Sequence, residues 1–487
     1  MLKGIFISVL VLASASLSAE IRYVDTQLAQ DCTRYDIATR TCLTGSENAT
    51  NNVDQALKNV KPGDTLVLRA GIYRPIVIQR SGIKSQPITI QGAENEAVII
   101  TGHHVGFMIK NQRYVTIKNL RVKQVQGFAR LENATGIIFD NIDFSYAFAS
   151  GTTGSLKIVS SQYNKVLNSH FSQGSDLLIL QDDANFNVIQ GNSFATSEHS
   201  SISIRCSSQN VLRDNTFNNP RQKAMEIYDC QGISDAPIRY QATKGNLVEQ
   251  NNFLGTRGSS RSYKYNAIQH CGQQTIVRNN VFTGNLGGGV SYQYYPKECL
   301  NVYDNKLYNN TFYNNRCFAI MGSKQSSERY HDNFAINNLL YKNTNCKGEW
   351  GQVLISNPES VFLENNSIVE KDPGFVDPLS GDLHLTANSR QIDQGDFITK
   401  TRSSGSGTLL PVKDASWFYD GFSIPGEQGD RIRIEDRKGT AIILSIDSDT
   451  NTLMLSSPLT WGRHDGVHLN YSGNAPDIGA FEFQGNE

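Results

Sequence analysis

The sequence predicts an all-β solenoid, a stack of parallel coils, with a capping helix at one end and a small antiparallel β module at the other. Forty glycines and 13 prolines among 487 residues are typical of many short strands joined by tight turns. A repeated motif, N-x-[V/I/L]-x-x-N-x-F, recurs at intervals of 23 residues between positions 164, 187 and 210. A period in the low twenties with several β-rich runs predicts coils that stack about 4.8 Å apart. The motif occurs as NVIQGNSF, NVLRDNTF and NLVEQNNF from Asn187, Asn210 and Asn246, with the variants NKVLNSHF and TIVRNNVF from Asn164 and Thr275.

Charge and hydropathy exclude two classes of protein. The chain has 45 basic and 46 acidic side chains, a formal charge of -1, so it lacks the basic excess of a nucleic-acid binder. A mean hydropathy of -0.38 and the lack of a second long apolar run exclude a multi-spanning membrane protein. We expect a monomer with no nucleic-acid partner and no membrane span.

The first 19 residues have the layout of a secretory signal. Lys3 precedes the apolar run 5–13, and small residues end at Ala19, where we expect cleavage. The mature protein is therefore expected to be periplasmic or secreted, in a compartment where disulfides form. Cys32 and Cys42 enclose a short polar loop and are the predicted disulfide. Three further cysteines, Cys206, Cys230 and Cys271, are expected to form a ladder of small apolar groups.

Residues 20–86 are expected to cap the stack and supply its first strands. Within them, residues 51–60 carry Val53, Ala56, Leu57 and Val60 at helical spacing behind an asparagine cap. An open end of a parallel stack invites aggregation, so this helix is expected to cover the first coil.

The solenoid itself is expected over residues 87–399, with ten to twelve coils between Ile88 and Val369. Like residues stack on successive coils, so the motif asparagines should form ladders that satisfy one another. The motif phenylalanines should form one buried column, comprising Phe194, Phe217, Phe253 and Phe282.

Residues 400–487 are expected to form a small antiparallel module and a closing segment. The runs IRIED, AIILSID, TLMLSS and VHLNY alternate apolar and polar residues, as half-buried strands do. The phrase NAPDIGAFEF (474–483) follows them and is expected to close the chain.

The candidate site is the outer surface of one column of strands. If Ile202 and Ile204 point into the coil, strand alternation turns Ser203 and Arg205 outward. The same argument buries Met225 and Ile227 and exposes Glu226 and Tyr228. Aligning the later coils by their cysteines puts His270 in the row of Arg205, with Tyr292 and Tyr294 on the following coil.

A basic and aromatic surface suits an acidic polysaccharide. Eliminating a polyuronate requires a group that neutralises the carboxylate, a base for the adjacent proton and an acid for the leaving oxygen. We expect Arg205 to neutralise the carboxylate, His270 or Lys223 to be the base and Tyr228 to be the acid. The residues expected to bind substrate beside them are His199, Arg221, Lys264, Tyr292 and Tyr294.

No cofactor is required by this pattern, but Ca²⁺ is a candidate. Asp182, Asp183 and Glu226, with Asp229 nearby, supply the carboxylate oxygens that Ca²⁺ prefers. A bound ion would help to neutralise the substrate carboxylate.

Four phrases, PGDTLVLRAGIY, SQPITIQGA, DPGFVDPLSGDLHL and PDIGAFE, resemble segments of exported bacterial right-handed parallel β-helix proteins. This pectate-lyase-like group includes the alginate and chondroitin lyases of polysaccharide lyase family 6. The resemblance implies a right-handed parallel β-helix and a carbon-oxygen lyase that cleaves a uronic-acid-containing polysaccharide by β-elimination. Family 6 lyases have an R-H-G turn where this chain has Gln269-His270-Cys271-Gly272, and no clear K-S-x-x-N precedes it. The base of the reaction therefore stays open.

Three alternatives share the fold. An inverting glycoside hydrolase of the polygalacturonase type would use Asp182 or Asp183 with Glu226, although the N-T-D, G-H-G and R-I-K elements are absent. A uronate C5-epimerase would share the proton abstraction, but its D-P-H-D signature is absent. A non-catalytic glycan-binding adhesin would be favoured if the outward row were buried or fully paired.

Overall fold

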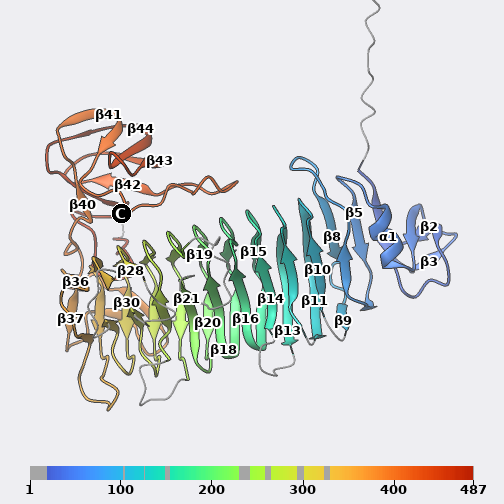
Figure 1. The fold of residues 1–487 in the computed structure, drawn as a ribbon, viewed down its shortest axis with the longest axis horizontal. Coiled ribbons are helices and arrows are strands. Elements are labelled where there is room, and N and C mark those ends of the chain that lie inside the picture. Colours follow the sequence, from blue (N-terminus) through green and yellow to red (C-terminus); the bar gives the residue numbers. More distant parts are fainter. Residues whose placement is uncertain are drawn as a thin grey trace, which may run out of the picture.

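The structure is a computed structural model, which describes residues 19–102, 105–125, 127–147, 154–229, 242–257, 265–292, 301–322 and 330–485. The predicted secretory signal lies outside the described residues except for Ala19. Figure 1 shows one long stack of strands with the C-terminal module beside its far end. The predicted all-β solenoid is confirmed, because the stacked strands pair in parallel from coil to coil.

Each coil contributes strands to three parallel faces, here called faces 1, 2 and 3. Ten successive pairings join eleven strands of face 1 from β8 to β36, in agreement with the predicted ten to twelve coils. Face 1 consists of β5 (Thr65–Leu68), β8 (Ile88–Gly92), the first parts of β11 (Val115–Val125) and β13 (Ile138–Ala147), β15 (Lys165–Leu167), β17 (Val188–Gln190), β19 (Val211–Arg213), β22 (Leu247–Glu249), β25 (Ile276–Arg278), β29 (Lys306–Tyr308), β33 (Asn333–Ile336) and β36 (Val361–Glu364).

Faces 2 and 3 follow along each coil, and several long strands bend from one face into the next. Face 2 consists of β6 (Gly71–Tyr73), β9 (Val98–Gly102), the second parts of β11 and β13, the first parts of β16 (His170–Gln181) and β18 (Ser193–Arg205), β20 (Thr216–Asn218), β23 (Asn252–Leu254), β26 (Val281–Thr283), β30 (Thr311–Tyr313), β34 (Leu339–Tyr341) and β37 (Ser367–Val369). Face 3 consists of β7 (Ile76–Ile78), β10 (Phe107–Lys110), β12 (Ala129–Glu132), β14 (Gly154–Val159), the second parts of β16 and β18, β21 (Lys223–Tyr228), β24 (Ile268–Cys271), β27 (Val290–Tyr292), β31 (Ile320–Gly322) and β35 (Val353–Ile355).

Stacks of identical side chains hold successive coils in register. The predicted phenylalanine column is confirmed: Phe194, Phe217, Phe253 and Phe282 are fully buried, with neighbouring ring centroids 4.6–5.1 Å apart. The predicted asparagine ladders are also confirmed, since each side-chain amide is bonded to the next coil. One ladder runs through Asn164, Asn187, Asn210 and Asn246, and another through Asn192, Asn215, Asn251, Asn280, Asn310, Asn338 and Asn366.

The Phe253→Ala variant is expected to lower the free energy of unfolding by about 3–5 kcal/mol. Phe253 is stacked between two rings at 4.8 and 4.6 Å, so the truncation leaves a cavity that the rigid coils cannot close. Urea denaturation measures the loss. The matched control is Phe362→Ala at the end of face 1. Because the Phe362 side chain is 37% exposed, its truncation should lower the free energy of unfolding by only about 1 kcal/mol. Equal losses for the two variants would contradict the packing argument.

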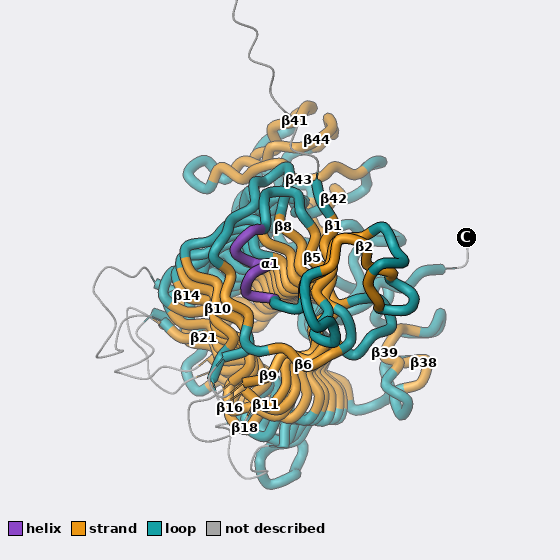
Figure 2. Tube along the Cα trace, turned by 90° about the vertical axis from the view of Figure 1, so that its right-hand side faces the viewer, coloured by secondary structure: helices purple, strands orange, loops and turns teal. Residues whose placement is uncertain are grey.

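The N-terminal cap also agrees with the prediction. Helix α1 (Val53–Asn59) is capped by Asn52, whose side chain accepts a hydrogen bond from the backbone amide of Gln55. Ala56 and Leu57 are buried against the first coil, and Figure 2 shows α1 over the end of the stack. The strands around it are β1 (Ile21–Val24), β2 (Cys32–Asp36), β3 (Thr41–Cys42) and β4 (Glu47–Thr50).

Two disulfides join cysteines within the described residues. Cys32 and Cys42 are bonded, as predicted. Cys317 and Cys346 form a second bond. Cys206 and Cys271 are both buried, and each of them also forms a disulfide. Cys230, the third member of the expected ladder of cysteines, lies outside the described residues.

The predicted C-terminal module is a six-stranded antiparallel sheet. One apolar cluster joins this module to the outer side of face 1. It contains Trp417 and Phe418 of the module together with Val211 and Leu247 of face 1. Its strands are β40 (Thr399–Lys400), β41 (Gly405–Pro411), β42 (Arg431–Ile434), β43 (Thr440–Asp447), β44 (Thr452–Trp461) and β45 (Gly466–Leu469).

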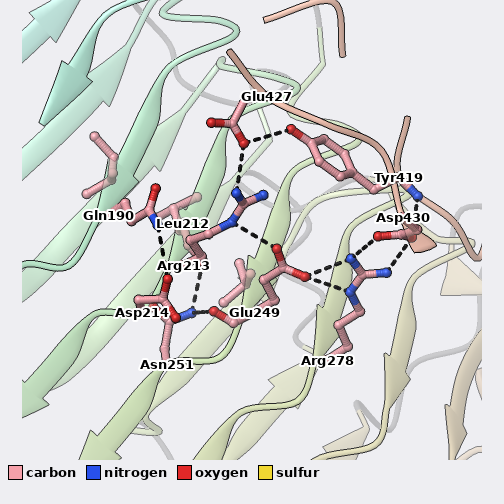
Figure 3. A network of polar contacts seen from close by, with 12 residues as sticks. Gln190, Leu212, Arg213, Asp214, Glu249, Asn251, Arg278, Tyr419, Glu427 and Asp430 are labelled. Carbon is pink, nitrogen blue, oxygen red and sulfur yellow. Dashed lines mark hydrogen bonds and ion pairs between the residues drawn. The ribbon is translucent and has the colours of Figure 1, made fainter. Parts of the chain in front are cut away.

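A buried ionic network reinforces this contact (Figure 3). Arg278 of face 1 binds Asp430 of the module through both terminal nitrogens, at 2.5 and 2.7 Å. The same guanidinium binds Glu249, which also accepts from Arg213 at 3.0 Å. Arg213 in turn binds Glu427 of the module at 2.8 Å. The module is therefore attached to face 1, away from face 3.

The remaining described strands are short. β38 (Phe375–Asp377) and β39 (Asp382–Leu385) form an antiparallel pair, and β28 (Val302–Tyr303) and β32 (Tyr330–His331) form a parallel one. Ile478 and Ala480 of the predicted closing segment pack with residues of face 2 such as Leu339. In the described part of the chain, no helix has the length and apolarity needed to cross a bilayer.

Candidate functional site on face 3

The outer surface of β18 and β21 carries the candidate site, and the predicted register of these two strands is confirmed. Ser203 pairs with Glu226, and Arg205 pairs with Tyr228. The residues between them are fully buried in the coil interior, as expected from strand alternation. These interior residues are Ile202, Ile204, Met225 and Ile227.

A buried carboxylate, that of Glu226, lies at the centre of the site. It is fully buried, and one of its oxygens, Oε1, forms an ion pair with the Lys223 ammonium and accepts a hydrogen bond from the Tyr228 hydroxyl at 3.3 Å. The Nε2 atom of His199 lies 3.6 Å from the same oxygen. The second oxygen, Oε2, is 3.9 Å from Arg205 Nη2 and has no hydrogen-bond partner. Glu226 therefore contacts a guanidinium, an imidazole, a phenol and an ammonium at once.

Sequence reasoning missed Asp176, which orients His199. The Nδ1 atom of His199 lies 2.8 Å from Asp176 Oδ1. This contact holds Nδ1 against the Asp176 carboxylate and orients the ring so that Nε2 faces Glu226. Asp176 and His199 are 23 residues apart, which is the coil period. That interval is the signal from which the pair could have been found.

Arg205 and Tyr228 present their functional groups side by side. Arg205 Nε donates to Ser203 Oγ at 2.9 Å, and its guanidinium carbon lies 5.9 Å from the centre of the Tyr228 ring. The Tyr228 hydroxyl accepts a hydrogen bond from Gln269 Nε2 at 3.2 Å. About a third of the side chains of Arg205 (33%) and His199 (36%) is exposed, whereas only 9% of Lys223 is. Arg205, His199 and the half-buried Tyr228 are thus accessible from solvent, whereas Lys223 and Glu226 are buried.

The predicted position of His270 was wrong. His270 pairs with Ile227 and then with Tyr292, and both His270 and Tyr292 are fully buried inside the coil. Burial lowers the pKa of His270 to about 3, so the ring stays neutral, and it raises the pKa of Tyr292. The alignment of cysteines put Cys271 beside Cys206, but Cys271 pairs with Tyr228. A shift of one residue turns each side chain to the opposite face of a strand.

The flanking residues predicted to bind substrate have different outcomes. Arg221 is exposed and paired with Glu198. Lys264 and Tyr294 lie outside the described residues. Of the five flanking residues, His199 is therefore the one that the described structure brings to the centre of the site.

The carboxylates proposed for Ca²⁺ are not assembled. Asp182 and Asp183 lie in the turn after β16, where their backbone amides donate to the carbonyls of Arg205 and Cys206. Glu226 is held in its ion pair, and Asp229 accepts from Asn301 at 2.7 Å. Among the described residues, no three acidic, histidine or cysteine side chains are grouped as a metal site.

Comparisons with known proteins support the fold. The model of the right handed beta helix region matches residues 105–238, and the Chondroitinase B model matches residues 47–128. No curated protein sequence matches the chain significantly.

Three solved structures illustrate the likeness of fold. Pectate lyase Pel9A is 14% identical, with 96% of this chain and 98% of that chain covered and a TM-score of 0.50. The family 6 alginate lyase AlyGC is 16% identical over 69% of this chain and 54% of that chain, with a TM-score of 0.47. A GH136 lacto-N-biosidase from Eubacterium ramulus is 11% identical over 72% and 68%, with a TM-score of 0.43. At these identities the likeness describes architecture, and the chain is therefore a right-handed parallel β-helix protein with a pectate-lyase-like fold.

Proposed function

We propose that this protein is an exported polysaccharide lyase that cleaves an acidic, uronic-acid-containing polysaccharide by β-elimination. The observation that carries the proposal is the group of three accessible side chains, Arg205, His199 and Tyr228, around the buried carboxylate of Glu226. The group supplies a cation, a base and a proton donor on one outer surface. These are the three functions that elimination next to a carboxylate requires.

In the proposed reaction, Arg205 binds the substrate carboxylate and stabilises the charge that develops on it. His199 takes the proton from the ring carbon that carries the carboxylate. The electron pair of that bond forms a double bond within the ring, and the neighbouring bond to the glycosidic oxygen breaks. Tyr228 donates its proton to the leaving oxygen. The products are an unsaturated sugar end and a free hydroxyl, so no oxidant or water is consumed.

The assignment of His199 as base follows from exposure and hydrogen bonding. A neutral imidazole whose Nδ1 donates to Asp176 keeps a lone pair on Nε2, on the side of the site. Lys223 is almost wholly buried, and its ion pair with Glu226 stabilises the protonated ammonium. In this proposal Lys223 and Glu226 are positioning residues, which hold the three accessible groups.

The hydrolase alternative requires two carboxylic groups that face the sugar from opposite sides. Glu226 is fully buried and ion-paired, and Asp176 is committed to His199. The described site thus favours elimination. Export is supported by the expected signal over residues 1–19 and by the disulfides, which are typical of oxidising compartments.

The proposal is tested by incubating the purified protein with alginate, polygalacturonate and chondroitin while recording ultraviolet absorbance. We expect absorbance to rise with at least one polymer, because elimination creates a double bond conjugated to the carboxylate. The matched control is the Arg205→Ala variant, which should fold and give almost no rise. New reducing ends without an absorbance change would instead establish hydrolysis, and an absence of both would favour a glycan-binding role.

A further inference from the structure

A row of outward side chains leads from the proposed site toward the N-terminal coils of face 3. Arg130 pairs with Lys157, and Lys157 pairs with Ile179 on the next coil. Ile179 in turn pairs with Ser203, the residue that holds Arg205. Two coil steps of roughly 4.8 Å therefore separate Lys157 from Ser203. In Figure 2 this face lies on the side of β10, β14 and β21, clear of the C-terminal module.

Lys157 is half-buried on this surface, and no described carboxylate forms an ion pair with it. Desolvation lowers the pKa of Lys157, and the nearby charges of Arg130 and Arg205 lower it further. The carboxylates of Asp182 and Asp176 raise this pKa, but neither lies within ion-pair distance of Lys157. A desolvated ammonium between two guanidinium groups destabilises the folded protein unless an anion joins it.

The neighbouring cation, Arg130, is only partly neutralised. Arg130 and Lys110 share one carboxylate, that of Glu132, at 3.1 and 2.8 Å. Two cations thus face one anion, and Lys157 adds a third positive charge on the next coil. The Arg130 side chain is 41% exposed, so a ligand anion can reach this group of cations from solvent.

We infer that Lys157 and Arg130 form a second anion subsite, which binds a carboxylate or sulfate on a sugar about two coils away from the one held by Arg205. The inference rests on the proposed function and narrows its substrate class. Ile179, a buried residue, occupies the position between the two subsites in this row, so the two anion-binding groups are separated by an uncharged position. A polymer that fills both subsites carries acidic groups repeatedly along its chain, so the preferred substrate is a regular polyanion rather than one with isolated uronates.

The test measures binding and cleavage separately. Affinity gel electrophoresis compares wild type with Lys157→Met on alginate, polygalacturonate, chondroitin sulfate and desulfated chondroitin, with neutral dextran as reference. Methionine keeps the apolar stem and removes the charge, and we expect about tenfold weaker binding of the polyanion. Lys157→Arg should restore binding. The matched control is Lys118→Met, a half-buried lysine on face 1, which should bind as wild type does.

The outcomes separate the subsite from the proposed reaction. A loss on alginate or polygalacturonate identifies a carboxylate as the bound group, and a loss confined to chondroitin sulfate identifies a sulfate ester. If Lys157→Met binds every polyanion as wild type does, the subsite is wrong, whatever the cleavage assay gives. If binding falls but no polymer yields unsaturated product, the subsite stands and the lyase reaction is wrong. Thermal unfolding should show an unchanged or higher midpoint for Lys157→Met, and Lys157→Gln is a second neutral variant if methionine does not fit.

Discussion

The Tyr228→Phe variant is expected to lower kcat by at least about a hundredfold on the polymer that the wild type cleaves, as for the loss of a general acid. The substitution keeps the ring that lies against Arg205 and removes only the hydroxyl, which bonds to Glu226 and Gln269. Polymer binding should therefore change little, and KM should stay within a few fold of the wild-type value. Initial rates of absorbance increase give kcat and KM.

The Tyr163→Phe variant is the matched control for this loss. Tyr163 is half-buried, stacked on Phe186 at a ring distance of 5.2 Å and packed in the cluster that joins the C-terminal module to face 1, so removal of its hydroxyl should leave kcat unchanged. A second comparison, His199→Gln with Lys223→Met, distinguishes the base. We expect His199→Gln to abolish turnover with normal polymer binding. Near-normal kcat in Tyr228→Phe and His199→Gln together would move the site away from this surface.

The Asp430→Ala variant is expected to lose about 3–5 kcal/mol of stability, since it leaves the buried guanidinium of Arg278 without its main counter-ion. Arg278 is 3% exposed and binds Asp430 through both terminal nitrogens (Figure 3). Asp430 also accepts from the backbone amide of Tyr419, so the change breaks contacts on both sides of the junction. Urea denaturation followed by tryptophan fluorescence measures the loss, since Trp417 and Trp461 lie in the module.

Two further variants separate the ion pair from a general effect of mutation in the module. Asp449→Ala removes an exposed carboxylate of the same sheet and should change stability by at most about 0.5 kcal/mol. The double variant Arg278→Met with Asp430→Leu removes both charges and should recover much of the loss, because the penalty arises from one unpaired buried charge. A loss below about 1 kcal/mol in Asp430→Ala would show that the apolar cluster alone holds the module to face 1.

The sequence determined the fold because its repeating residues act locally. Phe194, Phe217 and Phe253 recur at the same place in successive coils. Stacking the coils forms the backbone hydrogen bonds between them and buries these rings together. The helix behind Asn52 and the strands of the module were also predictable, since period and capping are local properties. The register of Arg205 and Tyr228 followed from alternation over two neighbouring coils joined by a regular motif.

Only the tertiary structure decided which groups meet at the site. His270 follows a long insertion, and the interval no longer fixes the strand register there, so one residue of slip turned an expected base into a core residue. The contact of Asp176 with His199, and the burial of Glu226 beneath Arg205, depend on side chains from three coils. The ion pair of Arg278 with Asp430 joins residues 152 positions apart in the sequence. Sequence periodicity determines what repeats, whereas contacts between non-repeating residues arise from how the completed coils are stacked.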